Sequence, residues 1–211
     1  MSDNPIKYPA KVCKHQKTGE EAVLLNGEAI ATVADYWRWA HSDLNSNAER
    51  GKFAEFLVAC SLGLKSEVSQ EWGAYDIDWD DGECKIKIEV KASAYLQIWG
   101  QKRLSSPLFS TRPSRKWDAE TNEYEEVSRR QADVYVFCLE NQKTQEDCNP
   151  NPLDLDQWEF HVLPTATLDA RGAKARVSLA QLETLGAEKV ASLPDLPDAI
   201  RRAFRSAVGK D

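Results

Sequence analysis

The chain has 211 residues, of which 42% are hydrophobic and 29% are charged, the composition of an ordinary globular domain. A chain of this length fits one domain with a sizeable core. The mean hydropathy is −0.56 and no apolar run is long enough to cross a bilayer, which excludes fibrous, membrane-spanning and extensively disordered proteins.

The charge balance is 27 basic against 34 acidic residues, a formal net charge of −7. The electric field of a negatively charged protein disfavours nucleic-acid binding unless Lys and Arg cluster locally. The opening residues, MSDNPIKYPAK, lack the apolar centre of a secretory signal. The five cysteines are scattered, with no CxxC pair, so we expect neither a zinc site nor disulfides, and a cytoplasmic location.

The first half of the chain predicts one strand, two helices and a hairpin. An edge strand at Ala22–Leu25 ends in a turn at Asn26-Gly27, and a helix over 32–41 follows. A second helix is expected over 48–62, with Asn47 as its cap and Gly63 at its end. Strands at 76–79 and 85–92, joined by Asp80-Asp81-Gly82, form the hairpin.

The second half predicts a long loop region over 100–126 with one strand near Leu108, then a doubly buried strand over 132–139. A strand over 158–163, a short helix capped by Ser178 and a terminal helix over 198–208 follow. This order predicts an α/β fold with a central mixed sheet flanked by helices. We expect a single domain over 1–211, with its core at about 32–163 and decorations at 1–31 and 164–211.

The segment KIKIEVK, residues 85–91, alternates apolar and charged side chains. Successive side chains of a strand point to opposite faces, so the pattern places Lys87, Glu89 and Lys91 together, away from the apolar face. Two interpretations stay open: a half-exposed strand whose charges serve solubility, or a strand that carries a site.

Asp76 and Asp78 share one face of the preceding predicted strand. Pairing of the two strands brings a carboxylate from each together across the ladder. Carboxylates so close repel, and they are often held together by a metal or a proton. The alternatives are a simple strand-start Asp76 and a solvated acidic turn over 78–81.

Glu55 is the only charged residue between Phe53 and Leu62. Because this predicted helix is apolar nearly all round, we expect it to be buried. A buried carboxylate needs a cation, a hydrogen bond or a proton, which makes Glu55 either a site residue or the partner of a core Arg or a loop.

In chain order, Glu55, Asp76, Glu89 and Lys91 resemble the active-site set of the PD-(D/E)xK nucleases, the restriction-endonuclease-like superfamily. The strings that carry the resemblance are RGKFAEFLV, AYDI and IEVKAS, and YWRWA and YLQIW are similar to a group of uncharacterised bacterial members. The resemblance covers about residues 32–139, and it rests on the order of several short motifs. Tyr75 stands where a Pro often precedes the Asp.

The resemblance implies a restriction-endonuclease-like core and a metal-dependent nuclease that hydrolyses DNA phosphodiester bonds, an endonuclease of restriction or repair type acting on double-stranded DNA. It further implies that Asp76, Glu89 and the Val90 carbonyl bind Mg²⁺, for which Mn²⁺ can substitute. Lys91 would position or deprotonate the attacking water, and Glu55 would bind a second ion or orient a water. Cutting both strands would favour a homodimer.

A basic stretch follows the site strand, with no acidic residue between Gly100 and Trp117. We expect it to follow the DNA backbone, and we expect Ser93 and Gln97 to contact the scissile strand. The alternatives are a loop neutralised by the acids of 118–126 and an ordinary polar turn. The candidate DNA-binding residues are Ser93, Gln97, Lys102, Arg103, Arg112, Arg115 and Lys116.

Two rival functions remain. One is a catalytically silent DNA- or protein-binding module on the same fold, against which all four candidate positions hold residues competent for the chemistry. The other is an interaction module without nuclease chemistry, consistent with the net acidity and the seven tryptophans. A steep salt dependence of DNA retention would separate DNA binding from protein binding.

Overall fold

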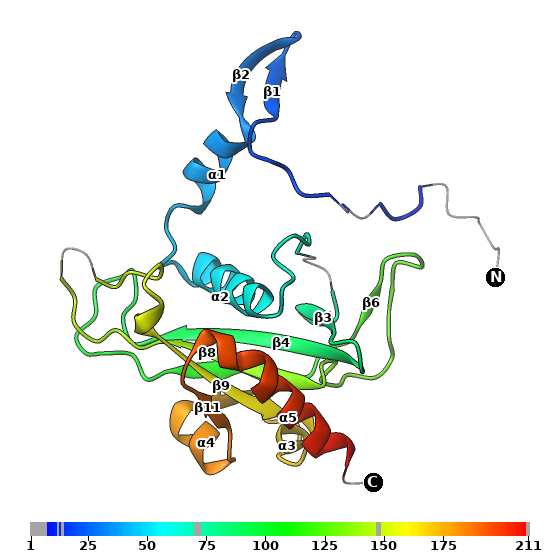
Figure 1. Ribbon diagram of the computed structural model, residues 1–211, viewed down its shortest axis with the longest axis vertical. Coiled ribbons are helices and arrows are strands. Elements are labelled where there is room, and N and C mark those ends of the chain that lie inside the picture. Colours follow the sequence, from blue (N-terminus) through cyan, green and yellow to red (C-terminus); the bar gives the residue numbers. More distant parts are fainter. Residues whose placement is uncertain (1–7, 12, 14, 70–72, 147–148, 210–211) are drawn as a thin grey trace.

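The computed structural model of the protein describes residues 8–11, 13, 15–69, 73–146 and 149–209 (Figure 1). The predicted mixed α/β fold is confirmed, because a five-stranded sheet of order β11-β9-β8-β4-β3 lies at the centre with helices packed against it. Its strands are β3 (Ile77–Asp80), β4 (Lys85–Ala94), β8 (Val134–Glu140), β9 (Trp158–Pro164) and β11 (Glu188–Val190).

The sheet is mixed because one of its ladders is parallel. β3 and β4 form the predicted antiparallel hairpin, and β8 pairs with β9 and β9 with β11 in the same antiparallel sense. β4 and β8 run parallel, with Ile88 opposite Val134 and Ala94 opposite Glu140. As expected for a central strand, every residue of β8 is buried.

Each face of the sheet has its own apolar cluster. The helices α2 (Asn47–Ser61) and α5 (Leu196–Val208) pack with the Ile86, Ile88 and Val90 side of β4. Tyr135 and Phe137 of β8 belong to the second cluster, with α3 (Thr165–Asp169), α4 (Leu179–Thr184) and the two-stranded sheet of β5 (Leu108–Ser110) and β10 (Arg176–Ser178). The region after residue 163 thus supplies part of the core, including the fully buried Leu196 and Ile200, rather than a decoration.

The predicted helices begin within two residues of where the sequence places them, at Val33 for α1 (Val33–His41), Asn47 for α2, Leu179 for α4 and Leu196 for α5. For α2 the cap is Ser46, whose hydroxyl accepts from the Glu49 N–H, and not Asn47, whose side chain instead accepts a hydrogen bond from Arg50. Ser178 caps α4 as predicted. Gly63 ends the α2 region with φ of 78°, a conformation that glycine adopts without strain.

The N-terminal arm is defined here as β1 (Ala22–Leu25), β2 (Glu28–Thr32) and α1 (Val33–His41), and its hairpin projects from the body of the molecule (Figure 1). The arm contacts α2 through α1, by His41 and Glu49 at 3.0 Å, and Trp37 of α1 lines the same cleft as Phe56. β1 and β2 form an antiparallel hairpin through the predicted Asn26-Gly27 turn. A second small hairpin, β6 (Trp117–Asp118) with β7 (Glu123–Tyr124), lies in the region predicted as a loop. Among the described residues, no helix has both the length and the apolar composition to span a membrane.

Candidate active site

The Lys91 ammonium is shared by two carboxylates. Its Nζ lies 2.6 Å from Glu89 Oε1 and 3.8 Å from Asp76 Oδ2. All three side chains are between 19% and 28% exposed, so the cluster is shielded from bulk water yet open on one side. A partly desolvated site of this kind strengthens electrostatic interactions with a bound anion or cation.

The hairpin register explains why Asp76 reaches this position. Ile77 lies opposite Ile88, so Asp76, one residue before β3, lies opposite Glu89. The expected approach of one carboxylate from each strand is therefore confirmed for this pair. Asp76 Oδ2 also accepts a hydrogen bond of 2.7 Å from the Val90 N–H. Because the N–H and C=O of a strand residue face the same edge, the Val90 carbonyl is directed to the side occupied by Asp76.

Asp78 lies outside this cluster. Its carboxylate accepts a hydrogen bond from the Tyr75 hydroxyl at 3.2 Å, and its strand partner is Lys87. It is exposed, in agreement with the solvated alternative.

Glu55 approaches the cluster from α2. Its Oε2 pairs with Lys52 Nζ at 2.6 Å, so its partner is a lysine one turn earlier rather than the core Arg considered from the sequence. The expectation of a helix buried all round is wrong, because Phe56 is 49% exposed and the buried residues lie on one side. Lys52 was missed by sequence reasoning, although its i, i+3 spacing to Glu55 is a recognisable pairing signal.

The pKa shifts of Glu55, Glu89 and Lys91 have common causes, because Asp76 contributes to each of them. Burial, and then the neighbouring Asp76, raise the pKa of Glu89 against the opposing effect of Lys91. Burial also raises the pKa of Glu55, with Lys52 opposing it and Asp76 adding to it. Burial alone would lower the pKa of Lys91, but Asp76 and Glu89 outweigh it and the pKa lies above its usual range. The excess of negative charge favours a further cation.

The donor chemistry fits a hard divalent cation. Asp76, Glu89 and the Val90 carbonyl offer oxygen donors at one sheet edge, the ligand type that Mg²⁺ prefers. In the described part of the chain, no three His, Cys, Asp or Glu side chains are grouped as around a metal ion. The two carboxylates instead converge on the Lys91 ammonium.

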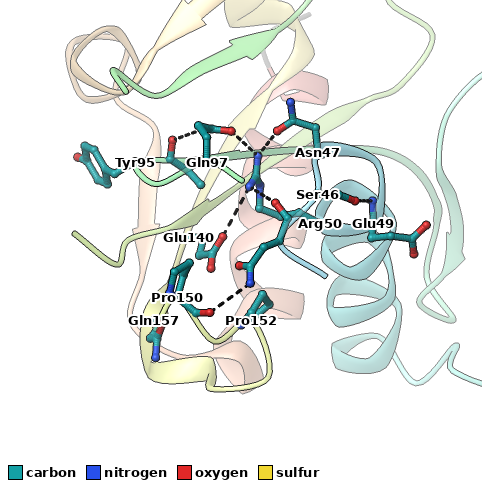
Figure 2. Close-up of polar contacts among 12 residues, drawn as sticks. Ser46, Asn47, Glu49, Arg50, Tyr95, Gln97, Glu140, Pro150, Pro152 and Gln157 are labelled. Atoms are coloured by element: carbon teal, nitrogen blue, oxygen red, sulfur yellow. Dashed lines mark hydrogen bonds and ion pairs between the residues drawn. The ribbon is translucent and has the colours of Figure 1, made fainter. Parts of the chain in front are cut away.

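Arg50 holds the start of α2 against the end of the sheet (Figure 2). Its Nη1 lies 3.8 Å from Glu140 Oε2 at the end of β8, and the two side chains are only 4% and 1% exposed. The same nitrogen donates to the Asn45 carbonyl at 3.0 Å, and Nη2 donates to Asn47 Oδ1. This buried network, which sequence reasoning missed, fixes the helix on which Glu55 lies five residues later.

Gln97 and Ser93 are engaged within the protein. The Gln97 amide donates to the Ala94 carbonyl at 2.9 Å and accepts from Arg50 Nη2 at 3.4 Å (Figure 2). Ser93 Oγ accepts from the Leu108 N–H at 3.2 Å. These bonds agree with the polar-turn alternative.

A cleft of about 1350 Å³ contains Glu55 and Asp76 and extends along β3. Of the predicted basic stretch, Lys116 lines it; Lys102, Arg103, Arg112 and Arg115 are exposed but do not. Acidic side chains, among them Asp78 and Asp133, also line the cleft. The exposed cations along it are Lys52, Lys65, Lys87, Lys116 and Arg129.

Comparison of the chain with protein-family models, with curated proteins and with solved structures finds no match. A functional conclusion therefore has to rest on the side chains of the site themselves.

Proposed function

We propose that the protein is a metal-dependent deoxyribonuclease, an endonuclease of restriction or repair type with double-stranded DNA as its favoured substrate. The observation that carries the proposal is the convergence of Asp76 and Glu89 on Lys91, with Glu55 in the same electrostatic environment. Two carboxylates and a lysine at one sheet edge suit phosphodiester hydrolysis, which needs a cation site beside a positively charged group.

Asp76 and Glu89, with the Val90 carbonyl, would hold Mg²⁺ or Mn²⁺. The bound ion would supply an acidified water and neutralise charge that develops on the phosphate. Lys91 presents N–H donors to the attacking water or to a phosphate oxygen, and its partial burial strengthens that attraction. Glu55, paired with Lys52 at 2.6 Å, would orient a water or a second ion.

The cleft supplies the substrate path in this proposal. It contains Glu55 and Asp76 together with exposed cations, among them Lys52, Lys87 and Lys116. Cations along a groove attract the phosphate backbone without reading its sequence. The mixed sign of the lining favours binding that depends on a few contacts rather than on a broad positive field.

The test is cleavage of supercoiled plasmid and of single-stranded DNA with Mg²⁺, Mn²⁺ or EDTA. We expect metal-dependent cutting, and we expect Lys91→Ala to lower the rate by about 10²-fold or more, as for the loss of other charge-stabilising groups. Lys85→Ala is the matched control, because Lys85 is exposed and faces the same side of β4 at its far end.

A folded wild-type protein that cuts neither substrate with either metal would contradict the proposal. If that protein retained DNA without cutting it, the result would support the catalytically silent binding module. A steep salt dependence of DNA retention would then identify phosphate contacts.

A further inference from the structure

The N-terminal arm exposes an unusual amount of apolar surface. All four residues of β1 are exposed, and α1 has no buried residue at all. The largest contributions come from six side chains, which are between 39% and 85% exposed and which we call the apolar arm surface: Leu24, Leu25, Ile30, Tyr36, Trp37 and Trp39.

The arm is folded by local bonds rather than by a core. The Thr32 hydroxyl and Asp35 form a capping box, and the Ala34 N–H donates to the Gly19 carbonyl at 2.9 Å. The Trp37 ring packs so closely on Gly19 that a Cβ there would lie 3.1 Å from it. Isolated two-stranded hairpins and helices of nine residues are marginal in water, so this element needs a covering surface.

The free edge of β1 has the features of a strand that can pair with another strand. Ala22–Leu25 carries no charge and no proline, the features with which proteins protect a strand edge. The irregularity of the hairpin falls on β2, where Ile30 is the extra residue between the Val23–Ala31 and Leu24–Ala29 pairs. β1 is therefore the regular edge, and in the described part of the chain β2 is its one strand partner.

We propose that the arm is a dimerisation element whose partner is a second copy of this chain. An antiparallel β1–β1 pairing across a twofold axis is self-complementary, because the same edge serves both copies. The six side chains of the apolar arm surface expose on the order of 700 Å² in total. Because Leu24 and Leu25 point to opposite faces of the hairpin, a dimer that covers one face buries part of the roughly 800 Å² that each partner contributes to a stable interface. With the proposed nuclease function as its premise, such a dimer supplies one site for each strand of a duplex.

Light scattering after size-exclusion chromatography, over a wide range of protein concentration, tests the proposal without any DNA. We expect the wild type to have twice the chain mass of 23.8 kDa. Leu24→Glu and Trp39→Glu should each give the monomer mass. Leu153→Glu is the matched control, because Leu153 is 66% exposed and lies outside the arm, and it should remain a dimer.

Hydrogen exchange gives an independent readout. The β1 amides should exchange slowly in the wild type and rapidly in Leu24→Glu, while the β8 amides stay protected in both and so report an intact fold. A wild type that stays monomeric, or a dimer that survives both arm substitutions, would overturn the proposal. Binding of a monomer to anionic phospholipid vesicles would assign the surface to a membrane instead. Because none of these readouts needs cleavage, they fail separately from the nuclease assay.

Discussion

Lys91 determines the charge balance of the candidate site, since it is the cation that Asp76 and Glu89 share. Its place follows from a single rule: in a strand that alternates KIKIEVK, positions 87, 89 and 91 must face the same way. The site could be predicted to this extent because residue periodicity fixes side-chain direction. The i, i+3 spacing of Lys52 and Glu55 indicates that they can pair, but the sequence does not show which side of α2 is open, because that depends on packing by distant segments.

His161 lies in β9 and is 2% exposed. Burial lowers the pKa of His161, against the effect of Glu159, whose carboxylate lies 3.6 Å from Nε2, and with a smaller lowering by Lys189. The unfolded histidine binds a proton near pH 6.5, whereas the folded one resists it, so stability falls as the pH drops below about 6.5.

Urea denaturation at several pH values should therefore show a shallower acid loss for His161→Gln than for the wild type. Glu55 and Glu89 have raised pKa values, so protonating them at acid pH favours the folded state and opposes the effect of His161. Both proteins contain these two residues, so their contribution cancels when the pH profiles of wild type and variant are compared. Parallel pH profiles for the two proteins would contradict this assignment.

At the scale of elements, the start of α2 depends on the buried Arg50–Glu140 pair. Removing one partner of a buried pair leaves an uncompensated charge, so Arg50→Met should lower the free energy of unfolding by about 3–5 kcal/mol. Glu140→Met alone should also destabilise, but the double variant should recover most of the loss, because a buried ion pair often contributes little over apolar residues. Chemical denaturation of all four proteins measures this coupling; additive losses would contradict it.

The elements that could be predicted are those with a sequence signal of their own, and they include short ones, since the three-residue β5 lies at the strand predicted near Leu108. The 15-residue α2, the β3–β4 hairpin and the doubly buried β8 could be predicted, because each has a clear period, turn or composition. The three-residue strands β10 and β11 could not, since a segment without such a signal gains its strand conformation from the neighbour with which it pairs.

At the scale of the whole molecule, the net charge of −7 means that the DNA binding we propose must depend on where cations lie. Lys116 is the one residue of the predicted basic stretch that lines the cleft, whereas Lys102 is also exposed but does not line it. In EDTA, Lys116→Ala should weaken duplex retention and reduce the steepness of its logarithmic salt dependence by about one. Lys102→Ala should leave both unchanged, and equal effects of the two substitutions would place the DNA outside the cleft.

The hydrogen bond between Asp76 and the Val90 N–H has a consequence for solubility. β3 begins only at Ile77, so among the described residues no strand lies beside the outer edge of β4 at Val90, and the Asp76 carboxylate accepts from the Val90 N–H there. A charged group at this point discourages a strand of another molecule from adding to the sheet. Asp76→Ala would uncover that edge and invite aggregation as well as remove a candidate ligand. Substituting Glu89 or Lys91 leaves the hydrogen bond between Asp76 and the Val90 N–H in place. These two positions are therefore better suited than Asp76 to an inactive variant that stays soluble.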